Sequence, residues 1–137
     1  LSRHLASWLT QQIDVPALGR SCDVTLPIPL SPQRLRERGY NQALLLARAL
    51  HCPQIQPQWL QRIRDTPPQA RQNRADRLRN LRGVFAVAPQ VQPQLAGRHV
   101  LLVDDVITTG ATLHAAAQAV LQAGAASVRA VALARTP

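Results

Sequence analysis

The segment that most constrains the fold reads HVLLVDDVITTGAT, at residues 99–112. Its residues 100–103 are continuously apolar, which is typical of a strand buried on both faces and hence of a parallel sheet covered by helices. Two adjacent carboxylates, Asp104 and Asp105, end this strand, and a Thr-rich turn leads into a helix predicted over 112–123. This order predicts an α/β fold whose ligands bind beyond the carboxyl ends of the strands.

Strands and helices alternate along the rest of the chain. Apolar runs predict strands over 23–30, 59–62, 83–88, 99–103 and 127–134. Helical spacing of apolar side chains predicts helices over 1–13, 41–50, 75–82 and 112–123. A proline at its end predicts that the strand over 23–30 leads into a loop, and polar stretches predict loops over 65–73 and 89–97. The alternation favours a mostly parallel sheet with helices on both faces.

The charge balance predicts an anionic partner. The 137 residues include 16 basic and 7 acidic side chains, which give a net charge of +9 at pH 7. Every basic residue is arginine, whose planar guanidinium can bind phosphate through two parallel hydrogen bonds. Nucleic acid, a nucleotide and pyrophosphate would all satisfy this charge, and the balance does not choose among them.

Length and cysteine usage narrow the class of protein. The length predicts one domain over 1–137. No run of about 20 apolar residues is present, so we expect no membrane span. Cys22 and Cys52 lack the spacing of a metal cage, and we expect them to be free thiols in the cytoplasm. The chain contains no methionine, so we expect it to be a processed or trimmed piece.

The residues that follow the predicted central strand suit a ribose 5-phosphate. The N–H groups and the dipole at the start of a helix attract one phosphate, and Gly110 lets the backbone approach it closely. Three hydroxyls add donors, those of Thr108, Thr109 and Thr112. Asp104 and Asp105 can accept hydrogen bonds from sugar hydroxyls or help to hold Mg²⁺. The alternative is that the carboxylates cap the next helix, which would account for one of them but not for both.

The run LLVDDVITTGAT at 101–112 resembles the phosphoribosyl pyrophosphate (PRPP) signature of the type I phosphoribosyltransferases. Two other phosphate-binding motifs are absent from the sequence. The Walker pattern needs a lysine, which the sequence lacks, and the pattern G-x-G-x-x-G does not occur. The wider chain resembles the ComF/GntX branch of that superfamily, which is amidophosphoribosyltransferase-like and associated with natural competence. The matching stretches are PIPL at 27–30, RLRERGYNQ at 34–42, R-x-R-x-T-x-x-Q at 62–69, R-x-x-N-L-x-G-x-F at 77–85 and the segment 123–135.

This resemblance implies a type I phosphoribosyltransferase fold, in which a mostly parallel sheet flanked by helices carries a PRPP loop after a central strand. It covers a core of about residues 20–135. ComF proteins usually carry an amino-terminal zinc ribbon with paired C-x-x-C motifs. None is present in this sequence, so we expect that upstream segment to be absent from the chain.

The resemblance also implies roles for individual residues. PRPP is expected at Asp104, Asp105, Val106, Thr108, Thr109, Gly110, Ala111 and Thr112. Mg²⁺ is expected at the two carboxylates, largely through PRPP. Pyrophosphate is expected at Arg34, Arg38 and Gly39. The sequence alone also allows a solvated basic turn at these last positions. The expected catalytic residues are Asp104, Asp105, Arg38 and Arg77.

Two functions stay open at this point. The first is an enzyme that uses Mg²⁺ and PRPP, transfers the phosphoribosyl group to an unidentified acceptor and releases pyrophosphate. The second is a non-catalytic PRPP-binding protein of competence or DNA utilisation that contacts single-stranded DNA. Its candidate phosphate contacts come from a basic cluster at 62–82 and are Arg71, Arg74 and Arg79, for which a solvated surface is the other interpretation. A homodimer is a further candidate in either case.

Overall fold

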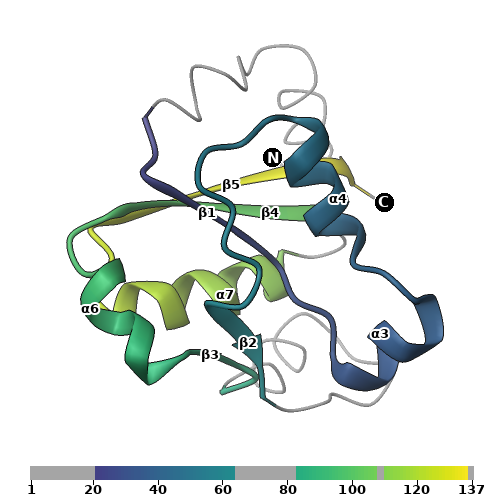
Figure 1. The fold of residues 1–137 in the computed structure, drawn as a ribbon, viewed down its shortest axis with the longest axis horizontal. Helices are drawn as coiled ribbons and strands as arrows, with labels where there is room; N and C mark the ends of the chain where they lie inside the picture. Colours follow the sequence, from purple (N-terminus) through teal and green to yellow (C-terminus); the bar gives the residue numbers. More distant parts are fainter. Residues whose placement is uncertain (1–20, 64–82, 108–109, 136–137) are drawn as a thin grey trace.

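A computed structural model of the chain describes residues 21–63, 83–107 and 110–135. The described residues form an α/β fold built on a parallel sheet (Figure 1). None of the described helices has the length and apolar character that a membrane crossing needs. Three predicted elements lie outside the described residues, namely the helices over 1–13 and 75–82 and the loop over 65–73.

The central sheet contains three parallel strands, β1 (Val24–Pro27), β4 (His99–Ile107) and β5 (Ser127–Arg135), hydrogen-bonded in the order β1–β4–β5. Residues 100–103 of β4 are completely buried. This burial is expected for a strand that is paired on both edges and covered on both faces. The predicted parallel sheet is confirmed for these strands.

Side chains of β4 alternate between two cores, because successive residues of a strand point to opposite faces. Leu102 belongs to the core that includes α7 (Ala111–Gln122). Leu101 belongs to the core that α4 (Gln42–Ala49) covers with Ala47. Figure 1 shows α4 above the sheet and α7 below it. The sheet is therefore enclosed on both faces, as the sequence predicts.

A second sheet has two antiparallel strands, β2 (Leu60–Arg62) and β3 (Phe85–Val87). Its buried side chains join the core that contains α7. Two short helical segments follow β3, η1 (Pro89–Val91) and α6 (Gln92–Leu95). The prediction of a loop over 89–97 is wrong for its first part, because side chains of η1 and α6 pack into the same core.

The loop predicted after the first strand is also wrong in part, because the chain forms α3 (Pro32–Arg38) there. The N–H of Arg34 donates a hydrogen bond of 3.2 Å to Oγ of Ser31, which caps the helix. A proline fits the first turn, and Gly39 ends the helix with a left-handed φ of 80°. No residue of α3 is buried, so the apolar spacing that would predict a helix is missing.

The remaining predictions for the described residues are close to the structure. The helices predicted over 41–50 and 112–123 are confirmed, with small shifts at their ends. β4 is longer than the predicted 99–103, because its ladder with β5 continues to Ile107. The two carboxylates expected after the strand therefore lie within it.

Leu102 should be a sensitive core position, because its side chain is fully buried on the central strand. Leu102→Ala should lower the free energy of unfolding by about 2–5 kcal/mol, through lost apolar burial and the cavity left behind. Urea unfolding followed by circular dichroism measures this change. Leu121→Ala is the matched control, because Leu121 is 48% exposed, and its loss should stay below about 1 kcal/mol. Equal losses in the two variants would contradict the burial of β4.

Candidate functional site

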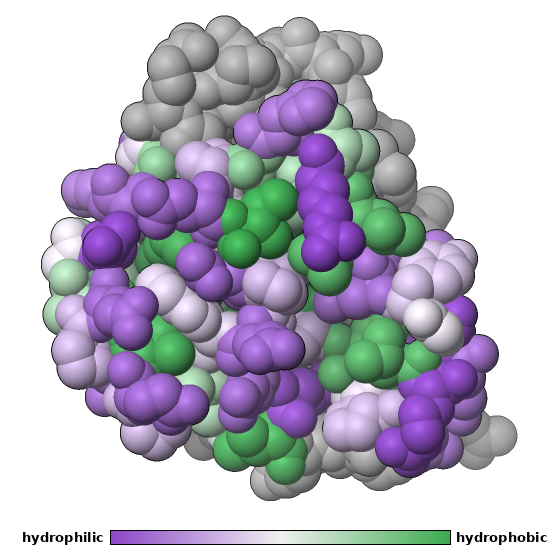
Figure 2. Space-filling model, viewed as in Figure 1, coloured by the Kyte–Doolittle hydropathy of each residue, from purple (hydrophilic) through white to green (hydrophobic). Residues whose placement is uncertain are grey.

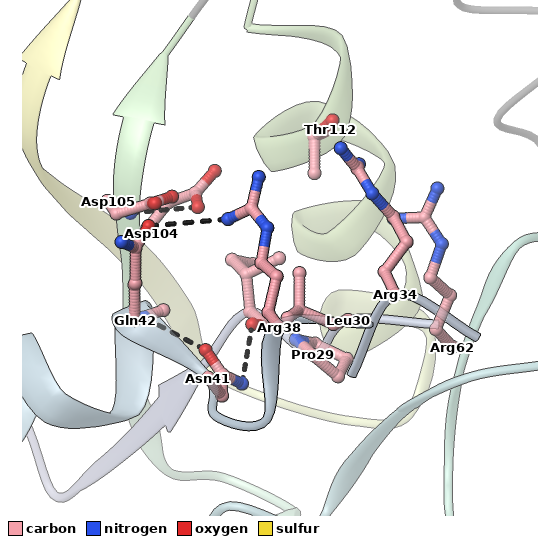
Figure 3. A pocket seen from close by; sticks show the side chains of 12 residues that line it. Pro29, Leu30, Arg34, Arg38, Asn41, Gln42, Arg62, Asp104, Asp105 and Thr112 are labelled. Carbon is pink, nitrogen blue, oxygen red and sulfur yellow. Dashed lines mark hydrogen bonds between the residues drawn. The ribbon is translucent and has the colours of Figure 1, made fainter. Parts of the chain in front are cut away.

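A cavity of about 400 Å³ opens at the carboxyl ends of β1 and β4 (Figure 3). Its walls come from the loop after β1, from α3 and the start of α4, from the ends of β2 and β4, and from the first turn of α7. These segments are far apart in the sequence. The cavity lies where a parallel sheet is expected to bind its ligand.

Two carboxylates of β4 line one side of the cavity. The N–H of Asp105 donates to Asp104 Oδ1 at 2.9 Å. The ladder with β5 keeps one register on both sides of Asp105, where Asp104 pairs with Ala132 and Val106 with Ala134. Neighbouring side chains of a regular strand point to opposite faces. Asp104 and Asp105 nevertheless both line the cavity.

Burial and the neighbouring Asp105 alter the ionisation of Asp104. The pKa of Asp104 is raised from its ordinary value of 3.8 to about 7. Burial of the carboxyl contributes most, followed by the hydrogen bond with the Asp105 side chain, and the charge of Asp105 adds to the rise. The Asp105 N–H and the positive charge of Arg62 lower this pKa. A cation or hydroxyl donors beside the pair would stabilise its ionised form.

Three arginines supply positive charge to the same cavity. Arg34 and Arg38 project from α3, where both side chains are exposed and hydrophilic side chains cover the surface (Figure 2). Nη1 of Arg38 donates to Oε1 of Gln42 at 3.3 Å. Arg62 is partly buried at the end of β2, and its guanidinium lies over the Phe85 ring, 5.4 Å from the centroid. Arg62 belongs to the basic cluster at 62–82 that the sequence offers for phosphate contacts, and the pairing of β2 with β3 brings it to this cavity.

Asn41 fixes the turn between α3 and α4 against the loop after β1. Its Oδ1 accepts hydrogen bonds from the N–H groups of Ala43 at 2.9 Å and Leu44 at 3.3 Å. Its Nδ2 donates to the carbonyl oxygen of Ile28 at 3.2 Å. The first contacts are those of a helix cap. The last contact joins two walls of the cavity, and no local sequence pattern indicates it, because Ile28 and Asn41 lie 13 residues apart.

The start of α7 forms the remaining wall. Gly110 precedes the helix with φ of 79°, a conformation that side chains with a Cβ rarely adopt. Thr112, in the first turn, lines the cavity. Because Gly110 occupies the N-cap position, the interpretation that Asp104 and Asp105 merely cap this helix is wrong.

The cavity brings together several of the predicted site residues. Its lining includes Asp104, Asp105, Arg34, Arg38 and Thr112. Gly110 and Ala111 adjoin it at the start of α7. Gly39 ends α3 as an exposed residue that does not line the cavity, and Val106 lies in β4. The other predicted residues lie outside the described part of the chain, namely Thr108, Thr109, Arg71, Arg74, Arg77 and Arg79.

Carboxylate oxygens are suitable ligands for a hard cation such as Mg²⁺. Within the described ranges, no group of three or more His, Cys, Asp or Glu side chains could hold a metal ion.

Comparisons with known proteins point to one family. The sequence pattern of the phosphoribosyl transferase domain matches residues 46–137. DNA utilization protein YhgH of Escherichia coli O157:H7 is 40% identical over 118 residues, which are 83% of this chain and 50% of that protein. Competence protein ComFC of Bacillus subtilis is 40% identical over 114 residues, which are 82% of this chain and 45% of that protein. The chain thus spans about half the length of these curated relatives.

A solved structure supports the same fold. The allosteric regulatory enzyme of purine biosynthesis superposes with a TM-score of 0.53 at 23% sequence identity. The match covers 96% of this chain and 25% of that enzyme. At this level of identity, the likeness concerns the fold alone.

The raised pKa of Asp104 predicts a pH-dependent stability in metal-free buffer. Between pH 3.8 and about 7 the folded state binds more protons than the unfolded state, so its stability should fall as the pH rises through this window. Asp104→Asn should remove this part of the fall and raise the free energy of unfolding at pH 8 by about 1–3 kcal/mol. Urea unfolding from pH 4 to pH 8 tests this expectation.

The matched control for this experiment is Glu37→Gln, because Glu37 is exposed on α3 and does not line the cavity. This variant should follow the pH profile of the unmodified protein. If the pH profile of unfolding for Asp104→Asn runs parallel to that of the unmodified protein, the raised pKa of Asp104 is contradicted.

Proposed function

Because the chain belongs to the ComF family of the type I phosphoribosyltransferase superfamily, we propose that it binds PRPP and transfers the phosphoribosyl group to an acceptor with release of pyrophosphate. One observation carries this proposal: a single cavity holds two carboxylates and three arginines beside the start of a helix. PRPP carries the complementary groups, which are a ribose diol, a 5-phosphate and a pyrophosphate.

Each part of PRPP has a proposed partner in the cavity. The start of α7, with Gly110, Ala111 and Thr112, would receive the 5-phosphate, because helix N–H groups and the helix dipole favour an anion there. Asp104 and Asp105 would accept hydrogen bonds from the ribose hydroxyls. The pyrophosphate would then face the arginines of α3. Thr108 and Thr109 lie outside the described residues, and in this arrangement they would belong to the PRPP loop that receives the 5-phosphate.

The proposed reaction requires mainly orientation and charge. The bond between ribose C1 and the pyrophosphate oxygen breaks, and its electron pair leaves with pyrophosphate. A lone pair of the acceptor forms the new bond to C1, and the acceptor gives its proton to a base or to water. Arg38, together with Arg77 outside the described residues, would neutralise the leaving pyrophosphate. Asp104 and Asp105 would orient the ribose while positive charge develops on it.

Mg²⁺ fits this site as a proposed cofactor. The adjacent carboxylates offer the oxygen ligands that a hard cation prefers. Asp104 and Asp105 would hold Mg²⁺ in part directly and largely through PRPP. The bound ion would supply positive charge that neutralises the pyrophosphate.

Removing both carboxylates tests the proposed ligand. Asp104→Asn with Asp105→Asn should lower the affinity for PRPP at least about tenfold, because each lost charge-assisted hydrogen bond costs about 1.5–3 kcal/mol. Isothermal titration calorimetry with Mg²⁺ at pH 8 measures this, and Glu37→Gln is the control with one acidic group removed elsewhere. Equal PRPP affinity in the double variant and in the unmodified protein would refute the assignment.

Release of pyrophosphate from labelled PRPP, across a panel of bases and amines, separates a transferase from a protein that only binds PRPP.

A second candidate function is that of a PRPP-binding protein that contacts single-stranded DNA. It is favoured by the net charge of +9 and by relatives that are named as DNA utilization and competence proteins. The described surface adds exposed arginines on α3. The residues expected to contact DNA, Arg71, Arg74 and Arg79, lie outside the described residues. A cytoplasmic location and a homodimer stay predictions under both functions.

The salt dependence of binding shows whether these arginines contact single-stranded DNA or the pyrophosphate of PRPP. Each contact with a single-strand phosphate should contribute about 0.7 to the slope of log affinity against log salt, so three or four contacts give a slope of roughly −2 to −3. Changing Arg71, Arg74 and Arg79 to alanine should flatten this slope and leave PRPP affinity nearly unchanged. Fluorescence anisotropy with a labelled oligonucleotide measures the slope. Single-strand binding that is the same in the triple variant would exclude these residues as DNA contacts.

A further inference from the structure

We propose that Cys22 and Cys52 form a reversible disulfide under oxidising conditions, and that this bond closes the chain segment that builds most of the cavity wall. They are the two cysteines of the sequence, and both are free thiols in this structure. The inference is carried by the shared packing of the two side chains and by the backbone pairing beside them. It does not depend on which ligand the cavity binds.

The two side chains pack in one core. Cys22 is 6% exposed and belongs to the core on the α4 side of the sheet, and Cys52 packs against the same core from the loop that follows α4. Burial raises the pKa of the Cys52 thiol, and the charge of Cys22 raises it further. Because the interaction between two charges weakens with distance, this effect agrees with the shared packing.

Backbone pairing brings both cysteines to the same part of β1. Thr25 forms a parallel bridge with Ile55, and Figure 1 shows the chain after α4 crossing β1. Each cysteine precedes its own member of this bridge by three residues. Paired parallel segments lie about 4.8 Å apart, which is within the range of Cα separations that a disulfide spans. The two cysteines can therefore meet with a small movement of the backbone.

The loop that carries Cys52 is held at both ends before any bond forms. The N–H of Cys52 donates to the carbonyl oxygen of Ala47 in α4 at 3.1 Å. The N–H of Thr25 donates to the carbonyl oxygen of Gln54 at 3.1 Å, and the N–H of Gln56 donates to the carbonyl oxygen of Thr25 at 2.9 Å. A loop that is already ordered loses little further entropy when a bond closes it.

The disulfide would tie the ends of the segment that forms most of the cavity wall. Residues 22–52 contain β1, α3 and α4, and they supply eight of the twelve residues that line the cavity. Cys22 precedes β1 and Cys52 follows α4, whereas the cavity opens at the end of β1 and the start of α4. Oxidation would thus stabilise this wall by restricting the unfolded chain, and it would leave the opening of the cavity free.

The difference in exposure sets the order of the exchange steps. Cys52 is half-buried, so its thiolate would attack a small disulfide such as oxidised glutathione and release one glutathione thiolate. The thiolate of buried Cys22 would then attack the Cys52 sulfur of the mixed disulfide and release the second glutathione. The protein loses two thiols and gains one disulfide, and the two thiol protons end on the two reduced glutathione molecules.

The test compares the folded and unfolded chain. The unmodified protein is equilibrated with reduced and oxidised glutathione at about pH 9, with and without urea, and mass spectrometry after acid quenching gives the oxidised fraction. In the unfolded chain the two thiols should have an effective concentration of about 1 mM. The equilibrium constant for the disulfide should be at least about tenfold larger in the folded protein, because the fold holds the cysteines together. The oxidised protein should accordingly unfold at a higher urea concentration than the reduced protein.

Two single variants test the order of the steps. Cys22→Ala should stop at the mixed disulfide of Cys52 with glutathione, because the second thiol is missing. Cys52→Ala should stay unmodified in the folded protein, because Cys22 is buried. Urea midpoints of the reduced variants show whether each one folds, and the comparison of the folded and unfolded chain needs neither variant.

The outcomes decide the proposal. A monomer that has lost both thiols, and regains them with dithiothreitol, supports it. A covalent dimer, a stable mixed disulfide in the unmodified protein, or a constant that is equal or smaller in the folded chain would overturn it. No PRPP is present in this experiment, so neither result bears on the proposed function.

Discussion

The burial of β4 on both faces is the constraint on which the rest of the structure depends. Its residues 100–103 have no exposed surface, and the strand is paired with β1 on one edge and β5 on the other. Asp104 and Asp105 directly follow these buried residues in β4, and they line a cavity whose other walls come from distant segments. The same packing that stabilises the sheet thus builds one side of the candidate site.

The cavity combines charges that are unfavourable in isolation. Two carboxylates lie next to each other at partial burial, and the pKa of Asp104 rises to about 7 as a result. Arginines from α3 and β2 line the same cavity, and the charge of Arg62 lowers the pKa of Asp104. A ligand that brings hydroxyl donors to the carboxylates and anionic groups to the arginines would satisfy both sides. This local complementarity is more informative about function than the overall charge of the protein, which any anionic partner would satisfy.

Some elements are predictable from the sequence and others are not, for identifiable reasons. The buried strands and the helices over 41–50 and 112–123 have strong apolar patterns, and the structure contains them. α3 has no buried residue, so its pattern is absent, although Ser31 and Gly39 are the residue types that begin and end helices. The continuation of β4 to Ile107 depends on its ladder with β5. A local pattern cannot contain that information.

The sequence by itself determined the α/β class, the central strand and the motif at 101–112, because these depend on the apolar spacing and residue types of short contiguous segments. Only the tertiary structure decided which side chains share the cavity. Asn41 reaches the carbonyl of Ile28, and Arg62 lies over Phe85, through the packing of segments that are distant in the chain. Such contacts follow from the pairing of strands and the closure of loops, which combine many weak local preferences into one arrangement.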